Sequence, residues 1–403
     1  MSRRIAMLGA GLFFFGPALA FAAGDRAAEI ENRRLAGFPA LSPAGDFPSR
    51  FEAWAVDHLP LRGHAVRAQA TLSEELFGEP PSYAAGDPLT YPRVVEGRDG
   101  WLYFGDDMAE ACRPVGTTAD VLARVRRLGE IVRASGRRFV FTVAPDKTTI
   151  YPDKLPDRFL GERCLARRKD AFWTALAAAR VPGYLDLRAP LEQLQRATGE
   201  PAYFRTDSHW NERAAALYGT ELARALQPDL SRGTRHVPLG PYVREGDLGR
   251  LLGASRSETV ARWGLVRDGV RELGRDDRDA PVAVRVANTT SGAALFRPDT
   301  LLIGDSFTRE SLPWITPYFA GLTVLRSDAP ANAGPARVAE YVRDSEVVVF
   351  EMVERYWAGG HGEMLTDATL TALEKALPPA RRPGEALRGR GPEQGATERR
   401  PSG

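Results

Sequence analysis

The stretch "YFRTDSHWNE", residues 203 to 212, contains an Asp and a His separated by a single residue. A His can remove the proton from a serine hydroxyl, and an Asp can hold the ring in the tautomer that this reaction needs. In an extended segment, residues two positions apart project to the same side, so the carboxylate of Asp207 can reach the ring of His209. An isolated pair of this kind is more often a surface pair, so its interpretation depends on a nucleophile elsewhere in the chain.

The candidate nucleophile is Ser306 in "LLIGDSFT", where an apolar strand pattern ends and a helix pattern begins. Ligands of open parallel sheets bind beyond the carboxyl ends of the strands, which is where this serine would lie. Gly304 permits a tight turn, and the backbone N–H of Ser306 is the expected donor to an oxyanion. Serine is also a common helix cap, and this stretch by itself supports a capping role equally well.

Four further residues are candidates for substrate contacts. Lys147 and Tyr151 follow the strand pattern "FTVAP", Arg309 lies just past Ser306, and Asn211 follows the D-x-H pair. For Lys147 and Arg309 the plainer interpretation is a side chain in solvent at a turn or a helix start. No His, Cys or carboxylate spacing is typical of a metal site, and we predict neither a metal nor a cofactor.

An alternation of helix and strand patterns begins near residue 118 and predicts the scaffold for these residues. Short apolar strands separated by helices are typical of a parallel sheet with helices on both faces, an α/β fold. Residues 228–298 interrupt this rhythm with short alternating stretches such as "VAVRVAN", which predict an inserted β-rich excursion. Before the alternation, "VVEGRDGWLYFGDD" predicts a hairpin. The predicted strands are 138–145, 183–187, 300–306, 321–327 and 345–352, and the predicted helices are 118–135, 166–180, 211–226, 308–319 and 335–343.

Composition bounds the class of protein. The chain has 403 residues, 43% hydrophobic and 26% charged, and can bury a large core. The net charge is only +2, so its Arg-rich composition does not predict a nucleic-acid partner. Residues 24–377 are expected to form the domain, whereas 378–403 are rich in Pro, Gly, Arg and Glu and are expected to be a disordered tail.

The first 23 residues predict export. Arg3 and Arg4 precede an apolar run over 5–23 that ends in small residues, as in a signal peptide. The run is also near the length that spans a bilayer, so a retained membrane anchor is the alternative. The rest of the chain is then outside the cytoplasm, where the two cysteines, Cys112 and Cys164, are expected to form one structural disulfide.

Taken together, "GDSFT" and the upstream D-x-H-W-N motif resemble the SGNH-hydrolase-like AlgJ/AlgX family, periplasmic proteins of alginate and related exopolysaccharide O-acetylation. The stretches "ENRRLAGFP", "GRDGWLYF" and "VAPDKTTIYPDKLP" match as well, so the resemblance covers scattered motifs over residues 29–357. It implies a flavodoxin-like fold with Ser306 as the nucleophile, His209 as the general base and Asp207 as its orienting partner. As in the acetyltransferase branch, the serine motif comes second and the Asp–His spacing is one residue shorter than in ordinary SGNH hydrolases.

The resemblance also implies a reaction and its partners. An acetyl group would pass to Ser306 and then to a hydroxyl of an exopolysaccharide, in the periplasm, beside a membrane-bound O-acyltransferase that supplies acetyl groups. Two alternatives remain: an acetylesterase with the same residues, and a non-catalytic polysaccharide-binding scaffold. The sequence separates transferase from esterase poorly, because exclusion of water from the site decides between them.

Overall fold

The computed structural model of the protein describes residues 16, 19–20, 37–39, 47–58, 91–253, 256–280 and 282–380. Most of the predicted export segment and most of the predicted disordered tail lie outside these residues. Among the residues described, no helix combines the length and the hydropathy needed to cross a membrane.

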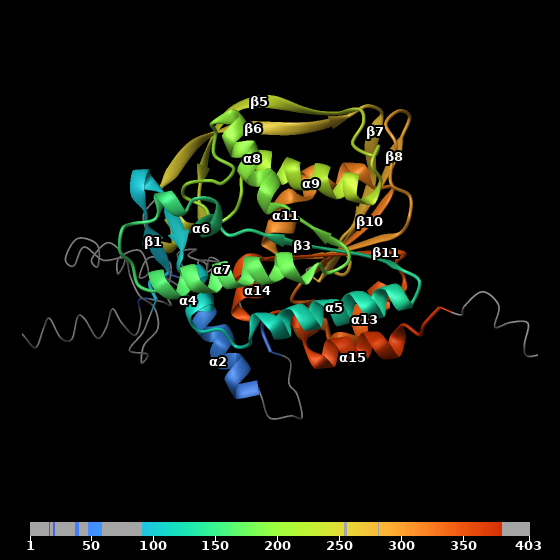
Figure 1. The fold of residues 1–403 in the computed structure, drawn as a ribbon, viewed down its shortest axis with the longest axis horizontal. Helices are drawn as coiled ribbons and strands as arrows, with labels where there is room; N and C mark the ends of the chain where they lie inside the picture. Colours follow the sequence, from blue (N-terminus) through green and yellow to red (C-terminus); the bar gives the residue numbers. More distant parts are fainter. Residues whose placement is uncertain are drawn as a thin grey trace, which may run out of the picture.

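A mixed sheet of seven strands forms the centre of the fold (Figure 1). Its strands are β3 (Arg138–Ala144), β4 (Tyr184–Leu185), β7 (Val270–Asp276), β8 (Ala283–Thr290), β9 (Thr300–Gly304), β10 (Gly321–Arg326) and β11 (Val347–Val353). Their order across the sheet is β4-β3-β11-β9-β10-β8-β7. The first five are parallel, and β8 and β7 continue the sheet in antiparallel pairing. The predicted α/β class is therefore confirmed.

Helices cover both faces of this sheet, as Figure 1 shows. The helices α8 (Arg188–Thr198), α9 (Glu212–Leu226) and α11 (Ser306–Ile315) pack on one face; α5 (Thr118–Ala134), α13 (Pro335–Arg343), α15 (Asp367–Ala376) and most of α7 (Glu162–Ala179) pack on the other. Successive strand residues point to opposite faces, so Val347 and Val349 of β11 join one core cluster and Val348 and Phe350 join the other. A strand buried on both faces reads as a continuous apolar run, which is why β11 is "VVVFEMV".

The smaller elements surround the sheet. They are α2 (Phe47–Asp57), β1 (Val94–Glu96), β2 (Leu102–Phe104), α4 (Gly105–Cys112), α6 (Lys147–Ile150), β5 (Thr234–Glu245), α10 (Asp247–Leu251), β6 (Ser257–Arg267), α12 (Ala329–Ala333) and α14 (Glu354–Gly359), with 3-10 turns at Arg98–Gly100, Pro152–Lys154, Thr316–Tyr318 and Glu363–Leu365. The strands β1 and β2 pair as the hairpin that was predicted around "GRDG". Cys112 at the end of α4 and Cys164 in α7 form a disulfide, with their Cα atoms 5.2 Å apart.

The region 228–298 differs from the predicted excursion. Only β5 and β6 stand apart from the central sheet, as a two-stranded antiparallel ribbon. The following strands, β7 and β8, are part of the central sheet, because β8 pairs with β10 along residues 283–287. Alternating apolar residues fit a separate hairpin and an antiparallel sheet edge equally well, so the sequence pattern could not distinguish the two.

Candidate active site

Ser306 lies at the carboxyl end of β9, where the strand turns into α11. Asp305 caps the helix, since its Oδ1 accepts from the N–H of Phe307 at 2.8 Å and its Oδ2 accepts from the N–H of Val353 at 2.7 Å. The turn is tight: a Cβ on Gly304 would lie 2.2 Å from Oγ1 of Thr308. Glycine is therefore required at this position, and Ser306 becomes the first residue of the helix, with a partly exposed side chain.

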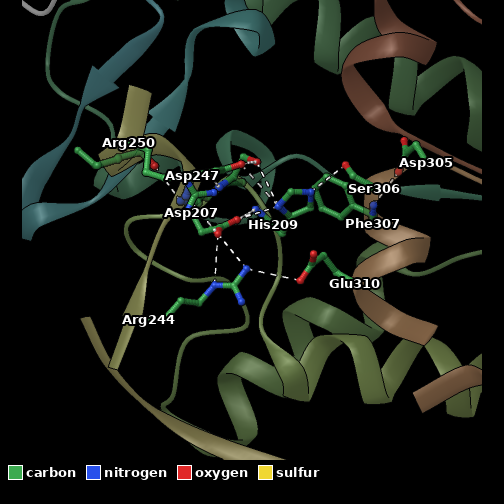
Figure 2. A network of polar contacts seen from close by, with 12 residues as sticks. Asp207, His209, Arg244, Asp247, Arg250, Asp305, Ser306, Phe307 and Glu310 are labelled. Atoms are coloured by element: carbon green, nitrogen blue, oxygen red, sulfur yellow. Dashed lines mark hydrogen bonds and ion pairs between the residues drawn. The ribbon is translucent and has the colours of Figure 1, made fainter. Parts of the chain in front are cut away.

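The loop before α9 brings His209 to this serine (Figure 2). Nε2 of His209 is 2.8 Å from Oγ of Ser306, and Nδ1 is 2.7 Å from Oδ1 of Asp207. The same Oδ1 accepts the backbone N–H of His209 at 3.0 Å. With the ring proton on Nδ1 facing a carboxylate, the lone pair of Nε2 faces the serine hydroxyl, which is the arrangement that general-base activation of a serine requires.

Burial and nearby charges have opposite effects on the pKa values of Asp207 and His209. Burial favours the protonated carboxyl of Asp207, but the hydrogen bond and charge of His209 and the charge of Arg244 outweigh it and hold the pKa of Asp207 well below its usual range. Burial likewise disfavours a charged ring, but the hydrogen bond and charge of Asp207, with the charges of Asp247 and Glu310, raise the pKa of His209. The carboxylate is thus ionised and supports an imidazolium.

Arg244 of β5 holds the outer oxygen of Asp207. Its Nη2 and Nε donate to Oδ2 of Asp207 at 2.9 and 3.2 Å. The guanidinium also lies 3.5 Å from Glu310 of α11 (Figure 2). It lies 4.3 Å from the ring centroid of Phe204. Arg244 therefore links the β5–β6 ribbon to the loop that carries His209 and to the helix that begins at Ser306.

Asp247, the first residue of α10, binds Ser208, which lies between Asp207 and His209. Its Oδ1 accepts from the N–H of Ser208 at 2.7 Å, and its Oδ2 accepts from the Ser208 hydroxyl at 2.6 Å. The N–H of Asp247 in turn donates to Oδ2 of Asp207 at 3.3 Å. Hydrogen bonds to Arg244 of β5 and Asp247 of α10 consequently hold Asp207 and Ser208, the two residues before His209.

Glu258 of β6 binds the start of the same loop. Its two carboxylate oxygens accept from the N–H groups of Arg205 and Thr206 at 3.1 and 2.8 Å, and one also accepts from the Thr206 hydroxyl at 2.8 Å. A Cβ on Gly246 would lie 1.9 Å from the carbonyl oxygen of Thr206, so the two backbones touch and only glycine fits. No sequence pattern indicated Arg244, Asp247 and Glu258, because they lie in a segment without a recognisable motif.

Asp207, His209 and Asp247 lie close enough together to be considered as metal ligands, with one ligand atom of each within 4.8 Å of the others. The hydrogen bonds of these residues favour a hydrogen-bonded catalytic group over a metal site. Both oxygens of Asp207 and both oxygens of Asp247 already accept from protein N–H or O–H donors. Arg244 supplies the positive charge at Asp207, so this donor set fits a hydrogen-bonded catalytic group.

Glu351 of β11 is buried behind the turn before Ser306, which is formed by Gly304 and Asp305. Its Oε2 accepts from the N–H of Asp305 at 3.2 Å and from the hydroxyl of Thr308 at 2.7 Å. Burial, together with the charge of Asp305, raises the pKa of Glu351 well above its usual range. Burial also raises the pKa of Asp305. The raised pKa favours the protonated form of the Glu351 carboxyl, whose Oε2 holds the turn before Ser306.

Lys147 and Arg309, two of the predicted substrate contacts, lie in different surroundings. Nζ of Lys147 is buried and donates to the carbonyl oxygens of Leu102 and Arg205 at 2.8 and 3.2 Å. Burial lowers the pKa of Lys147 to about 8. The lysine thus supports the backbone two residues before Asp207. Arg309 is exposed on α11, one turn after Ser306.

Tyr151 and Asn211, the other two, make contacts within the fold. The hydroxyl of Tyr151 is buried and accepts the N–H of Ala202 at 2.6 Å. Asn211 caps α9, and its side chain accepts from the N–H groups of Arg213 and Ala214. These contacts give both residues a structural role in holding the loop between 202 and 211.

A buried arginine that was not among the predicted site residues also faces the nucleophile turn. Arg355, just after β11, pairs with Asp146 at 2.7 Å and with Asp107 at 3.3 Å. Its guanidinium lies 5.7 Å from the ring centroid of Phe307, the residue after Ser306. The Phe307 ring packs in turn against the imidazole of His209, with centroids 4.9 Å apart.

Known proteins resemble this chain in sequence and in structure. Curated relatives named "Probable alginate O-acetylase AlgJ" are 26% identical over 205 residues in Pseudomonas syringae pv. tomato and 29% identical over 202 residues in Pseudomonas aeruginosa. These matches cover 49% and 48% of this chain and 48% and 47% of the relatives, so the chain spans about half the length of the curated relatives it matches.

Two solved structures are similar to most of this chain. The O-acetyltransferase domain of Pseudomonas putida AlgJ has a TM-score of 0.44 and 20% identity, covering 70% of this chain and 99% of that domain. Pseudomonas aeruginosa AlgX has a TM-score of 0.45 and 15% identity, covering 70% of this chain and 66% of that protein.

A family model described as "SGNH hydrolase-like domain, acetyltransferase AlgX" matches residues 94–315. The matched range is more than half of the 403 residues and contains Asp207, His209 and Ser306. The chain therefore belongs to this family of SGNH hydrolase-like acetyltransferase domains.

Proposed function

We propose that this protein is an O-acetyltransferase that acetylates hydroxyl groups of an alginate-like exopolysaccharide through an acetyl-serine intermediate. One observation carries the proposal: a partly exposed Ser306 hydroxyl 2.8 Å from Nε2 of a buried His209, whose Nδ1 faces an ionised Asp207. Membership of an acetyltransferase family and the alginate O-acetylase names of the relatives support the choice of acetyl transfer to this polymer.

The first half-reaction loads the serine. Nε2 of His209 takes the proton of the Ser306 hydroxyl as Oγ attacks the carbonyl carbon of an acetyl ester or thioester. The tetrahedral intermediate collapses when the bond to the donor's leaving group breaks, and the imidazolium of His209 gives its proton to that group. The acetyl ester of Ser306 remains, and His209 is neutral again.

The second half-reaction transfers the acetyl group. A sugar hydroxyl gives its proton to Nε2 of His209 and attacks the carbonyl carbon of acetyl-Ser306. Oγ leaves and regains the proton from the imidazolium. In both steps negative charge develops on the acetyl oxygen, and the backbone N–H of Ser306 at the start of α11 is the proposed donor to it, since N–H groups of the first helical turn have no partner within the helix.

The cellular setting is part of the proposal. An apolar N-terminal segment preceded by two arginines supports export to the periplasm, with or without retention in the inner membrane. A membrane-bound O-acyltransferase is the proposed partner that delivers the acetyl group to Ser306, as the resemblance to the AlgJ/AlgX family implies.

The test combines an activated acetyl ester with an alginate oligosaccharide. We expect mass spectrometry to show an acetyl group on the peptide that contains Ser306, and acetylated oligosaccharide to form faster than free acetate. Ser306→Ala is expected to abolish both signals. Acetate release that is indifferent to the oligosaccharide would instead identify an esterase, and an Ala variant that acetylates as fast as wild type would leave only a non-catalytic binding role.

A further inference from the structure

A second carboxylate faces the imidazole of His209 from the side that already carries Asp207. Oδ2 of Asp247 is 3.7 Å from Nδ1 of His209, and both side chains are 5% exposed. The hydroxyl of Ser208 stands between them, 3.3 Å from Nδ1, while it donates to that same oxygen of Asp247 at 2.6 Å. Two buried carboxylates thus approach one ring nitrogen.

The two carboxylates are not equivalent, because Arg244 binds only one of them. The guanidinium donates twice to Oδ2 of Asp207, at 2.9 and 3.2 Å. Both donors bind the same oxygen, so the arginine takes up part of the negative charge of Asp207. When His209 gains a proton, the carboxylate of Asp207 is therefore shared between the guanidinium and the imidazolium, and a second carboxylate near the ring lowers the cost of the buried positive charge.

We propose that Asp247 is a positioning residue that supplies the second negative charge with which the imidazolium of His209 is stabilised during acetyl transfer. This inference rests on the proposed function, since the imidazolium forms in each half-reaction at Ser306. The negative charge of Asp247 acts on the ring from close by, since its Oδ2 lies 3.7 Å from Nδ1. The hydrogen bonds from Ser208 keep the carboxylate facing the ring.

Other charged groups surround His209, and any pH effect has to be judged against them. Within the part of the chain that the structure describes, they are Asp207 on its own loop, Arg244 on β5, Asp247 on α10, and Asp305 and Glu310 at the start of α11, with Lys147 of α6 acting on Asp207 and Asp247. Of the carboxylates, Asp207 and Asp247 have an oxygen within 4 Å of the ring nitrogen Nδ1. Among the described residues, Asp247 is therefore the nearest source of charge besides Asp207.

The substitution Asp247→Asn tests this role, because Asn keeps an acceptor for the N–H of Ser208 and removes the charge. Only neutral His209 acts as a base, so activity rises with pH as the ring loses its proton. Losing Asp247 destabilises the imidazolium, so we expect the His209 titration to move down by about one pH unit, a tenfold change in the proton affinity. The kcat/KM at high pH is expected to fall by about threefold to tenfold.

Glu258→Gln is the matched control. Like Asp247→Asn, it removes a carboxylate that binds the loop before α9. The carboxylate of Glu258 accepts from the backbone N–H groups of residues 205 and 206 and makes no bond to the His209 ring. We expect the His209 titration of Glu258→Gln to stay within about 0.3 pH units of wild type, well below a one-unit effect. An equal shift in both variants would overturn the specific role of Asp247.

The titration is best followed by NMR of the full chain with 13C-labelled histidine, without any substrate. The sequence has five histidines, and His209→Gln assigns the signal. An unchanged His209 midpoint in Asp247→Asn overturns the inference, even if activity falls, because the residue would then only hold the loop. Since no turnover is needed, this result stays separate from a failure of the proposed acetyl transfer.

Discussion

Oγ of Ser306 and Nε2 of His209 lie 2.8 Å apart although 97 positions separate the two residues in the chain. The packing of α9 on α11 brings them together. The indole N–H of Trp210, next to His209, donates to the hydroxyl of Ser311 on α11 at 2.9 Å. A Cβ on Gly219 of α9 would lie 2.1 Å from the carbonyl oxygen of Trp314, so the two helices touch along their backbones.

Replacing either reacting residue is expected to remove the same step. Ser306→Ala and His209→Gln should each lower kcat by about 10⁴-fold or more, because neither group activates acetyl transfer without the other. The double variant should be no slower than the single ones. Rates of acetate or acetyl-oligosaccharide formation provide the measurement, and additive losses would show that the two residues act independently.

Arg244→Lys is expected to be far from conservative. Lysine keeps a positive charge but does not reproduce the two donors, Nε and Nη2, that converge on Oδ2 of Asp207. The carboxylate then has more freedom to turn away from His209, and we expect kcat/KM to fall by about 10- to 100-fold, or about 1.4 to 2.7 kcal/mol in transition-state stabilisation. Retention of full activity with lysine would mean that the charge alone suffices.

The pH profile of kcat/KM should contain one acidic limb that belongs to His209. Its pKa is raised, so the ring stays protonated to a pH above the usual midpoint of about 6.5, and activity is lost as pH falls through the raised value. Asp207 should contribute no limb in the working range, because its pKa is held well below the usual value. Stopped-flow acetylation of the enzyme between pH 5 and 9 checks this, and a midpoint below 6 would contradict it.

Glu351→Gln should be tolerated at neutral pH. A carboxyl whose pKa is raised in the folded state adds stability below its unfolded value and loses that contribution as pH rises through the folded value. Glutamine resembles the protonated acid, so we expect the free energy of unfolding to change by less than about 1 kcal/mol at pH 7, and the variant to be the more stable protein in alkali. Urea unfolding from pH 6 to 9 measures both.

Glu351→Leu is the matched comparison for that variant. Leucine removes the acceptor for the N–H of Asp305 and the hydroxyl of Thr308, both at the nucleophile turn. An unsatisfied buried donor costs about 1 to 3 kcal/mol, so this variant should be clearly less stable than Glu351→Gln at every pH. Equal stability of the two would indicate that the hydrogen bonds at Glu351 contribute little.

The disulfide between Cys112 and Cys164 should contribute about 2 to 4 kcal/mol to the free energy of unfolding, because it restricts the unfolded chain. The Cys112→Ala/Cys164→Ala double variant is expected to show this loss in chemical denaturation. Wild type unfolded under reducing conditions should match the variant. No difference between oxidised and reduced wild type would argue against a stabilising bond.

The sequence predicted the candidate catalytic residues and most of the scaffold. Strand and helix patterns from 118 onward are local signals, and the elements β3, β9, β10 and β11 formed where periodicity placed them. The D-x-H spacing and the GDS turn are local as well, because a side chain two residues away, or at the end of a strand, is positioned by backbone geometry alone. These signals sufficed to name Asp207, His209 and Ser306 as one candidate site.

Only the tertiary structure decided what holds that site in place. Arg244, Asp247 and Glu258 come from a segment whose sequence predicts no more than a β-rich insertion, and their partners lie tens of residues away. It also decided that β7 and β8 complete the central sheet and that Lys147, Tyr151 and Asn211 make contacts within the fold. Such contacts depend on the summed packing of distant segments, which no local pattern of residues encodes.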